Sequence, residues 1–284
     1  MPVHPYVVGF LYEFSEPGPD EFLQPIRFRF EEALDRGELD RPIELIVARG
    51  YGLPEGTAKA VRDAWSSLAN DGALLILGPG NTDNALAVKS LVESRKVPTI
   101  NFSGSERSRG EYCFHYQVGS LPDEGPLIAR ALAARSLNRV AVVRDRSPIG
   151  EEYWEYFSEE AGNRGLSVVS DQKVFPVQSE LSHEVRRARE SGAEALVYLG
   201  IGLVLVPIMR ALNECAWRVP SFTNTAGLRY YFMTPEERAL SEGWTYVDMY
   251  DERNEELQAL LNRYEERFGE RPVGPLVPSM YDMG

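Results

Sequence analysis

One arrangement occurs twice in this chain: a short run of apolar residues, then a glycine, then a helix-like segment. The first copy runs from residues 73–77 through Gly78 to residues 84–94, and the second from residues 195–199 through Gly200 to residues 203–212. A fully apolar run of this length is typical of a strand buried on both faces of a parallel sheet. Two such βα units, about 120 residues apart, predict two lobes facing each other across a cleft. In such sheets ligands bind at the carboxyl ends of the strands.

Strand-like and helix-like segments alternate along nearly the whole chain, which predicts an α/β protein with doubly wound parallel sheets. We predict strands over residues 6–11, 43–48, 73–77, 96–102, 114–118, 139–143, 166–170, 195–199, 219–223 and 244–249. We predict helices over residues 22–35, 55–70, 84–94, 123–135, 151–165, 180–191, 203–212 and 254–268. The first lobe is expected over residues 1–119, completed by about 250–284, and the second over 120–249. Residues 278–284 resemble the start of a helix, so we expect the C-terminal part of the fold to be truncated.

Length and charge narrow the class of partner. The chain has 284 residues, enough for two domains, and carries a formal charge of −13. Nucleic acids and anionic membranes both require basic patches, so we expect neither as a partner. No run approaches the roughly 18 apolar residues of a membrane span, and any membrane association is expected to be peripheral.

The amino terminus leaves two locations open. Residues 1–5 lead directly into the first predicted strand, without a basic leader, an apolar core and a small-residue cleavage site. We expect a cytoplasmic protein if Met1 is native, and a periplasmic one if a leader has been removed.

The residues that could carry catalysis do not form a recognisable set. His4, His115 and His183 are not near a serine or cysteine elbow, and no histidine, cysteine or carboxylate cluster has metal-ligand spacing. A hydrolase using Ser103 or Ser105 is an alternative, but neither serine is accompanied by an evident base. We therefore expect a protein that is not an enzyme and holds no metal or cofactor.

Polar loops follow four of the predicted strands, at residues 12–15, 80–82, 101–105 and 224–227. Backbone N–H groups at a helix start, together with hydroxyl groups, suit a carboxylate or another compact polar group. Each loop alone is equally explained by turn and helix-cap chemistry, which Thr82, Ser103 and Asn224 would satisfy. Four loops at one set of strand ends favour a binding cleft.

Several short stretches also occur in a characteristic order, at residues 8–11, 41–45, 77–82, 97–105, 123–125, 139–143 and 149–150. In this order they resemble the type I periplasmic binding proteins, in particular the leucine/isoleucine/valine-binding branch of the ABC-transporter solute-binding proteins, and the related cytoplasmic amide sensor. The resemblance implies two Rossmann-like lobes that close on a small ligand. It also implies that hydroxyl and backbone N–H groups at Thr82, Ser103 and Ser105 hold a ligand carboxylate.

The loops and the resemblance together indicate a set of ligand-binding positions. They are Tyr12, Phe14, Gly80, Asn81, Thr82, Ser103, Gly104, Ser105, Leu121, Asp123, Ile149, Gly202, Asn224, Thr225 and Ala226.

The resemblance does not extend to the amine side of an amino-acid ligand. The acid that would pair with the ligand ammonium aligns with Ala226, and the acid near the first crossing aligns with Leu121, close to Asp123. A buried ammonium without a counter-charge costs several kcal/mol. A carboxylate without an amine, an amide or a small aromatic acid therefore fits better, with Tyr12, Phe14 and Tyr230 as candidate stacking surfaces.

Two functions follow from the resemblance. The first is a non-enzymatic solute-binding protein that closes on an amino-acid-like ligand, a carboxylate or an amide and delivers it to an ABC permease. The alternative is a cytoplasmic small-molecule sensor that acts on a regulatory protein. The gene sequence upstream of Met1 separates the two.

Overall fold

The predicted strands form two sheets, each of five parallel strands. In the computed structural model, which describes residues 4–15, 18–116 and 120–284, the strand orders are β2-β1-β3-β4-β5 and β10-β9-β8-β6-β7. The chain divides into two compact units: unit 1 holds residues 1–118 and 250–284, and unit 2 holds residues 119–249. The predicted α/β class with parallel sheets is confirmed.

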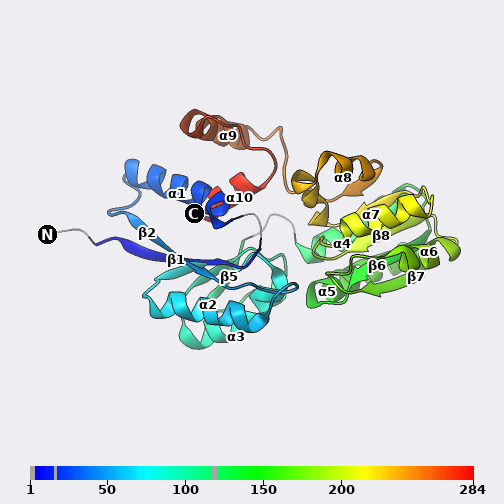
Figure 1. Cartoon of the computed structure of the whole chain (residues 1–284), viewed down its shortest axis with the longest axis horizontal. Coiled ribbons are helices and arrows are strands. Elements are labelled where there is room, and N and C mark those ends of the chain that lie inside the picture. Colours follow the sequence, from blue (N-terminus) through cyan, green and yellow to red (C-terminus); the bar gives the residue numbers. More distant parts are fainter. Residues whose placement is uncertain (1–3, 16–17, 117–119) are drawn as a thin grey trace. The chain divides into compact units, whose positions relative to one another are not determined.

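Unit 1 alternates strands and helices and then receives two helices from the end of the chain (Figure 1). Its elements are β1 (Tyr6–Tyr12), α1 (Pro19–Asp35), β2 (Ile43–Arg49), α2 (Ala58–Asn70), β3 (Leu75–Leu77), α3 (Thr82–Arg95), β4 (Thr99–Asn101), the 3₁₀ turn η1 (Glu106–Ser108), β5 (Cys113–His115), α9 (Glu255–Phe268) and α10 (Leu276–Met283).

Unit 2 repeats this pattern from a single continuous stretch of chain. Its elements are α4 (Leu121–Ala134), β6 (Arg139–Asp145), α5 (Pro148–Asn163), β7 (Ser167–Val174), α6 (Ser182–Glu190), β8 (Ala195–Leu199), α7 (Leu205–Glu214), β9 (Ser221–Thr223), the 3₁₀ helix η2 (Thr225–Phe232), α8 (Pro235–Leu240) and β10 (Trp244–Tyr246).

Both sheets have the same topology when their strands are counted from the start of each unit. The first strand of each sheet, β1 or β6, pairs with the second strand on one side and the third on the other. The strand order reverses between β1 and β3, and again between β6 and β8. In open parallel sheets ligands bind at the carboxyl ends of the strands at this reversal.

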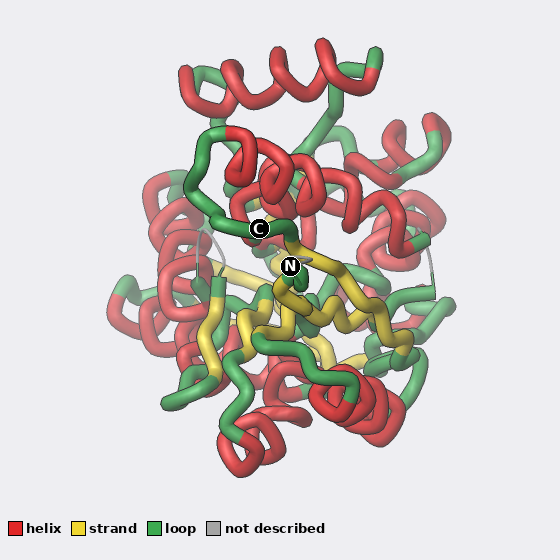
Figure 2. The backbone as a smooth tube through the Cα atoms, turned by 90° about the vertical axis from the view of Figure 1, so that its left-hand side faces the viewer, coloured by secondary structure: helices red, strands yellow, loops and turns green. Residues whose placement is uncertain are grey.

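Alternation of side chains along β1 builds two cores in unit 1. Val8, Phe10 and Tyr12 pack with residues of α1 and α10, whereas Leu11 packs with residues of α2 and α3. Figure 1 shows α1 and α10 on one side of this sheet and α2 and α3 on the other, and helices likewise lie on both sides of the strands in Figure 2.

Unit 2 is built on the same principle around β6. Ala141 and Val143 pack with residues of α6 and α7, whereas Val140 and Val142 pack with residues of α4 and α5. The five residues of β8 are all buried, as expected for a strand covered on both faces. Among the described residues no helix is long and apolar enough to cross a membrane.

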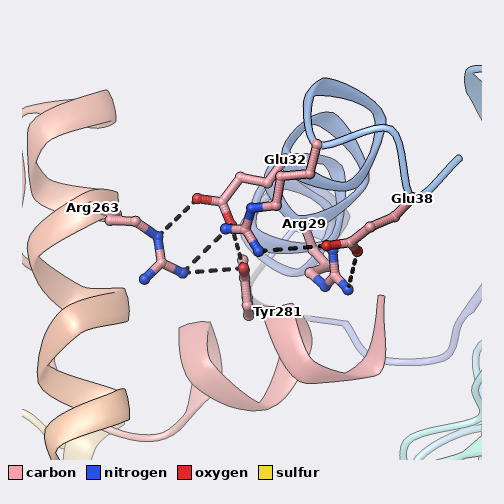
Figure 3. Close-up of polar contacts among 6 residues, drawn as sticks. Arg29, Glu32, Glu38, Arg263 and Tyr281 are labelled. Atoms are coloured by element: carbon pink, nitrogen blue, oxygen red, sulfur yellow. Dashed lines mark hydrogen bonds and ion pairs between the residues drawn. The ribbon is translucent and has the colours of Figure 1, made fainter.

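The carboxyl-terminal helices are held on α1 by one ion pair and a cluster of aromatic rings. Glu32 of α1 accepts a hydrogen bond from Arg263 of α9 (Nε–Oε1 2.8 Å) and another from the hydroxyl of Tyr281 in α10. Figure 3 shows the three side chains converging from three helices. Beside them, the ring of Phe28 lies 5.8 Å from that of Tyr264 and 5.6 Å from that of Phe268. Contacts between distant parts of the sequence therefore complete unit 1.

Two helix starts differ from the sequence expectation, and the residues at each start explain the difference. Helix α1 begins at Pro19 rather than residue 22, with proline at the first helical position and Asp20 and Glu21 in its first turn. Helix α2 begins at Ala58 rather than residue 55, because the Thr57 side chain accepts a hydrogen bond from the Ala60 N–H.

Two further differences concern segments that the pattern did not resolve. The exit loop was expected over residues 224–227, but residues 225–232 form η2, and α8 follows with a capping box between Thr234 and Glu237. The strand expected over 114–118 is β5, which begins one residue earlier and ends at His115; residues 117 and 118 lie outside the described residues.

Candidate ligand-binding site

The loop after β3 positions the start of α3 at the reversal point of unit 1. Gly78 has φ +101°, and a Cβ there would lie 2.7 Å from the carbonyl oxygen of Leu11. Only glycine fits a left-handed conformation this close to neighbouring backbone. The chain therefore turns sharply and places Gly80, Asn81 and Thr82 at the carboxyl ends of β1 and β3.

Predicted hydroxyl groups from two loops meet beside this helix start. Ser103 Oγ donates a hydrogen bond to Thr82 Oγ1 (3.1 Å) and accepts one from the Ser105 N–H (3.1 Å). All three residues are buried, as is Gly104 between the two serines. Ser105 Oγ accepts from the Arg107 N–H, which caps η1. The loops after β3 and β4 thus form one polar cluster.

Both polar atoms of the Asn81 side chain form hydrogen bonds at the start of α3. Its Oδ1 accepts a hydrogen bond from the Asp83 N–H (2.8 Å), and its Nδ2 donates to the carbonyl oxygen of Leu53 (3.1 Å). Asn84 binds the same residue twice, through the Leu53 N–H (2.9 Å) and carbonyl oxygen (3.1 Å). The two amides therefore fix the loop before α2 to the start of α3.

Glu13, the residue after β1, is the most unusual side chain of this region. It is 3% exposed, and neither carboxylate oxygen has a hydrogen-bond partner of normal geometry. Burial raises the pKa of Glu13 to about 8, although the nearby backbone N–H groups of Asn81 and Gly80 and the side chain of Asn84 favour the charged form. Its own carbonyl oxygen accepts from the Gly52 N–H.

The two aromatic residues predicted here differ in exposure. Tyr12 is buried and contacts Phe14 and Phe22 edge to face, with ring centroids 6.0 and 5.6 Å away. Phe14 is 36% exposed and stacks on Phe22. A Cβ on Gly80 would lie 3.0 Å from the Phe14 ring and 3.6 Å from Glu13 Oε1. Phe14 and Glu13 therefore lie against the same glycine.

In unit 2 the residues after β8 and β9 are joined in the same way. Asn224 Nδ2 donates to the carbonyl oxygen of Gly200 (2.9 Å), and its Oδ1 accepts from the Gly200 N–H (3.3 Å). Gly202 has φ +104°, and a Cβ on it would lie 3.3 Å from Ala226. The predicted residues Gly202, Asn224, Thr225 and Ala226 thus lie together.

A buried acid fixes the loop after β8. Asp145, the last residue of β6, accepts hydrogen bonds from the Tyr198 hydroxyl (3.0 Å) and the Ile201 N–H (2.8 Å). The Tyr198 oxygen in turn accepts from the Gly202 N–H (2.9 Å). Burial and the neighbouring Asp145 carboxylate hold the pKa of Tyr198 well above its usual value.

A second buried acid fixes the start of η2. Glu124 of α4 accepts hydrogen bonds from the Thr225 N–H (2.8 Å) and the Tyr153 hydroxyl (3.0 Å). Burial raises the pKa of Glu124, against the lowering effect of these donors. Asp123, the predicted acid, is exposed and accepts from the Ser120 hydroxyl instead.

Leu121 and Ile149 belong to the core that covers one face of the unit 2 sheet. They lie near the starts of α4 and α5 and are almost fully buried. Tyr230, expected as a stacking surface, is part-exposed and lines a cavity of about 200 Å³ together with Trp244 and Tyr246.

Sequence reasoning missed Glu13, Glu124 and Asp145, although a signal was present for each. Glu13 and Asp145 directly follow or end strands whose inner residues are apolar. Glu124 shares the buried face of α4 with Leu121 and Ile128. An acid at a core-facing position is rare unless it is partnered or functional. Among the described residues no group of three or more histidines, cysteines or carboxylates could hold a metal ion.

The family assignment follows from a comparison of the whole sequence. A family described as periplasmic binding protein matches residues 5–284. The chain belongs to this family. No curated protein matches it at a significant level.

Solved structures of the same family have the same fold. A solute-binding protein of an ABC transporter from Rhodopseudomonas palustris, in complex with 3,4-dihydroxybenzoic acid, is 19% identical, with a TM-score of 0.77 over 98% of this chain and 78% of the other. A fatty acid ABC transporter substrate-binding protein from Thermomonospora curvata is 16% identical, with a TM-score of 0.79 over 98% of this chain and 73% of the other. A branched-chain amino acid transporter binding protein from Streptococcus pneumoniae, in complex with isoleucine, is 14% identical, with a TM-score of 0.82 over 98% of this chain and 81% of the other. The resemblance to type I periplasmic binding proteins is confirmed.

Proposed function

We propose that this family member binds a small polar ligand, amino-acid-like, a carboxylate or an amide, without converting it, and delivers it to an ABC permease. The observation that carries the proposal is the buried cluster of Thr82, Ser103 and Ser105 beside the start of α3. Hydroxyl and N–H donors at a helix amino terminus suit an anionic or strongly polar group.

The ligands named for similar structures support a carboxylate or a related group. Dihydroxybenzoic acid, fatty acids and isoleucine all carry a carboxylate and otherwise differ in shape and polarity. A shared carboxylate seat with a variable remainder of the pocket would explain this range. The polar cluster of unit 1 would be that seat here, with Gly80, Asn81 and Gly104 supplying the backbone around it.

The polar contacts of the serines support binding over catalysis. Ser103 Oγ is engaged with Thr82 and the Ser105 N–H, and Ser105 Oγ accepts from a backbone N–H. The ring of His115 meets the carbonyl oxygen of Ser105 (3.2 Å). A serine nucleophile needs a base that receives its proton. In the contacts named above, Ser103 Oγ donates to a hydroxyl group and Ser105 Oγ accepts from a backbone N–H.

Delivery would depend on closure. A ligand that contacts the strand ends of both units has a higher affinity for a closed state and shifts the population towards it. The predicted positions after β8 and β9 would supply the second half of the contacts. The closed form would then be the form that the permease recognises.

The proposal is tested by identifying a ligand and measuring shape. We expect native mass spectrometry of freshly purified protein to reveal one bound small molecule per chain, and small-angle scattering to show a smaller radius of gyration with ligand. Thr82→Val is expected to weaken binding by about tenfold or more, since it removes a hydrogen bond to a charged group. Thr245→Val, outside the predicted site, is the matched control. Unchanged scattering at saturating ligand, or turnover of the bound molecule, would overturn the proposal.

A further inference from the structure

Two features of unit 1 meet at the reversal point of its sheet. Glu13 follows β1, and the amino terminus of the 14-residue helix α3 follows β3. The Glu13 side chain is buried, neither of its carboxylate oxygens has a hydrogen-bond partner of normal geometry, and its Oε1 would lie 3.6 Å from a Cβ placed on Gly80. A buried acid without partners is costly unless a further group completes its hydrogen bonds.

The groups around Glu13 favour a cation as that further group. Asp83 of α3 is buried and raises the pKa of Glu13 through its charge, so two acids share this space. The ring of Phe14 borders it, because Phe14 and Glu13 Oε1 lie against the same glycine, Gly80, and the ring of Tyr12 contacts that of Phe14 edge to face. The guanidinium of Arg49 in β2 lies 5.9 Å from the centre of the Tyr12 ring. Acids beside aromatic rings are the surroundings in which ammonium groups bind.

We propose that Glu13 is the counter-charge for the ammonium group of the ligand and that the ligand is a zwitterionic amino acid. This inference rests on the proposed function. The ligand carboxylate would lie at the hydroxyl cluster of Thr82, Ser103 and Ser105, and its ammonium at Glu13. Both charged groups of the ligand would then be held by unit 1, and the missing acid at Ala226 would be compensated.

Release of a proton on binding would distinguish an amino-acid ligand from a ligand that carries only a carboxylate. With a pKa of about 8, Glu13 is mostly protonated at pH 7 without ligand. A bound ammonium favours the carboxylate form and lowers the pKa of Glu13, so binding releases a proton. Affinity should therefore rise with pH up to about 8. A ligand with a carboxylate alone would instead favour protonated Glu13.

The experiment uses the whole chain and defined probes. The twenty common amino acids are screened by thermal shift, and leucine and phenylalanine are compared with 4-methylpentanoate and 3-phenylpropanoate by calorimetry. Titrations at pH 7 in phosphate and in Tris separate proton release from binding heat. We expect at least one amino acid to bind at least about tenfold more tightly than its counterpart without an amine, with release of close to one proton.

Two variants assign the effect to Glu13. Glu13→Gln should weaken amino-acid binding by about tenfold or more and abolish proton release, while leaving binding of the amine-free counterpart unchanged. Glu44→Gln, an exposed acid on β2, is the matched control and should change nothing. Proton release by the unaltered protein tests the inference even if Glu13→Gln does not fold.

Several results would overturn the inference. They are equal affinity for the amine-free counterpart, proton uptake on binding, retention of proton release in Glu13→Gln, or no binding by any of the twenty amino acids. Binding and compaction with an amine-free carboxylate would leave the proposed function intact while removing this inference.

Discussion

At the scale of single residues, buried acids are the features that distinguish this chain. Asp145 and one carboxylate oxygen of Glu124 accept hydrogen bonds from tyrosine hydroxyls and backbone N–H groups, and the two acids fix loops at strand ends in unit 2. Glu13 occupies the corresponding edge of unit 1 without such partners. The contacts of the first two acids are structural, and the role that we propose for the third is to pair with the ligand ammonium.

Burial of Glu13 predicts a particular dependence of stability on pH. Its pKa is about 8 in the folded chain against an ordinary value of 4.5. Between these values the folded state binds the proton more tightly than the unfolded state, so stability falls as pH rises from about 4.5 to 8. The free energy of unfolding should fall by at most about 4–5 kcal/mol over this range.

Glu13→Gln tests this dependence because glutamine has nearly the same shape and does not titrate. We expect the variant to gain stability over the unaltered protein at pH 8.5, by about 1–4 kcal/mol, and to gain much less at pH 5. Urea unfolding at the two pH values measures the difference. Parallel stability curves for the two proteins would contradict the assignment of a raised pKa to Glu13.

At the scale of elements, a side-chain cap sets the start of a helix, and a buried ion pair links two neighbouring strands. Helix α9 begins at Glu255 because the Asn254 side chain accepts hydrogen bonds from the N–H groups of Glu256 and Leu257. In unit 2, Arg144 is 3% exposed and is held by Asp171 through two hydrogen bonds of 2.8 Å. Its guanidinium also lies 4.5 Å from the centre of the Trp154 ring.

The cap of α9 is tested by Asn254→Ala. Loss of both hydrogen bonds should destabilise the protein by about 1 kcal/mol. Glu266→Ala, at an exposed position in the same helix, should leave stability unchanged within about 0.5 kcal/mol. Both are measured by denaturant unfolding, and an equal loss in the two variants would show that the cap is not the cause.

The ion pair between β6 and β7 is tested by Asp171→Asn. The change leaves the buried guanidinium of Arg144 with a weaker partner, although Glu151 still pairs with it (2.6 Å). We expect a loss of about 1–3 kcal/mol. Asp63→Asn, on the exposed face of α2, should cost at most about 0.5 kcal/mol. A variant as stable as the unaltered protein would mean that Glu151 alone satisfies Arg144.

At the scale of the whole molecule, each unit has its own cores on the two faces of its sheet. Phe28 of α1 packs with the rings of Tyr264, Phe268 and Tyr281, all from the carboxyl-terminal segment. Phe157 of α5 is fully buried in the core that α4 and α5 share. Replacement of either phenylalanine by alanine should therefore destabilise a different unit of the molecule.

Hydrogen exchange read by peptide mass spectrometry tests that separation. Phe28→Ala should cost about 3–5 kcal/mol and speed exchange in α1, α9 and α10 while leaving α4 and α5 unchanged. Phe157→Ala should have the reverse effect. Similar acceleration in all these helices in both variants would mean that the two units open together.

The sequence by itself determined the α/β class, the parallel strands and the family. An apolar run such as β8, which begins and ends where predicted, identifies a strand from local sequence alone. The reason is that a strand buried on both faces has no polar position. The hydroxyl cluster was also foreseen as separate residues, since glycine, serine and threonine after a strand are local features. The starts of α1 and α2 were predicted wrongly, because Pro19 and the Thr57 cap, rather than periodicity, set them.

Only the tertiary structure decided which acids are buried and what they meet. Glu124 contacts the N–H of Thr225, 101 residues away, and Asp145 contacts Tyr198, 53 residues away. Glu13 lies beside Gly80 and Asn84, which arrive from another βα unit. Burial of a charged group depends on neighbours that distant segments bring to it, and no local pattern records that.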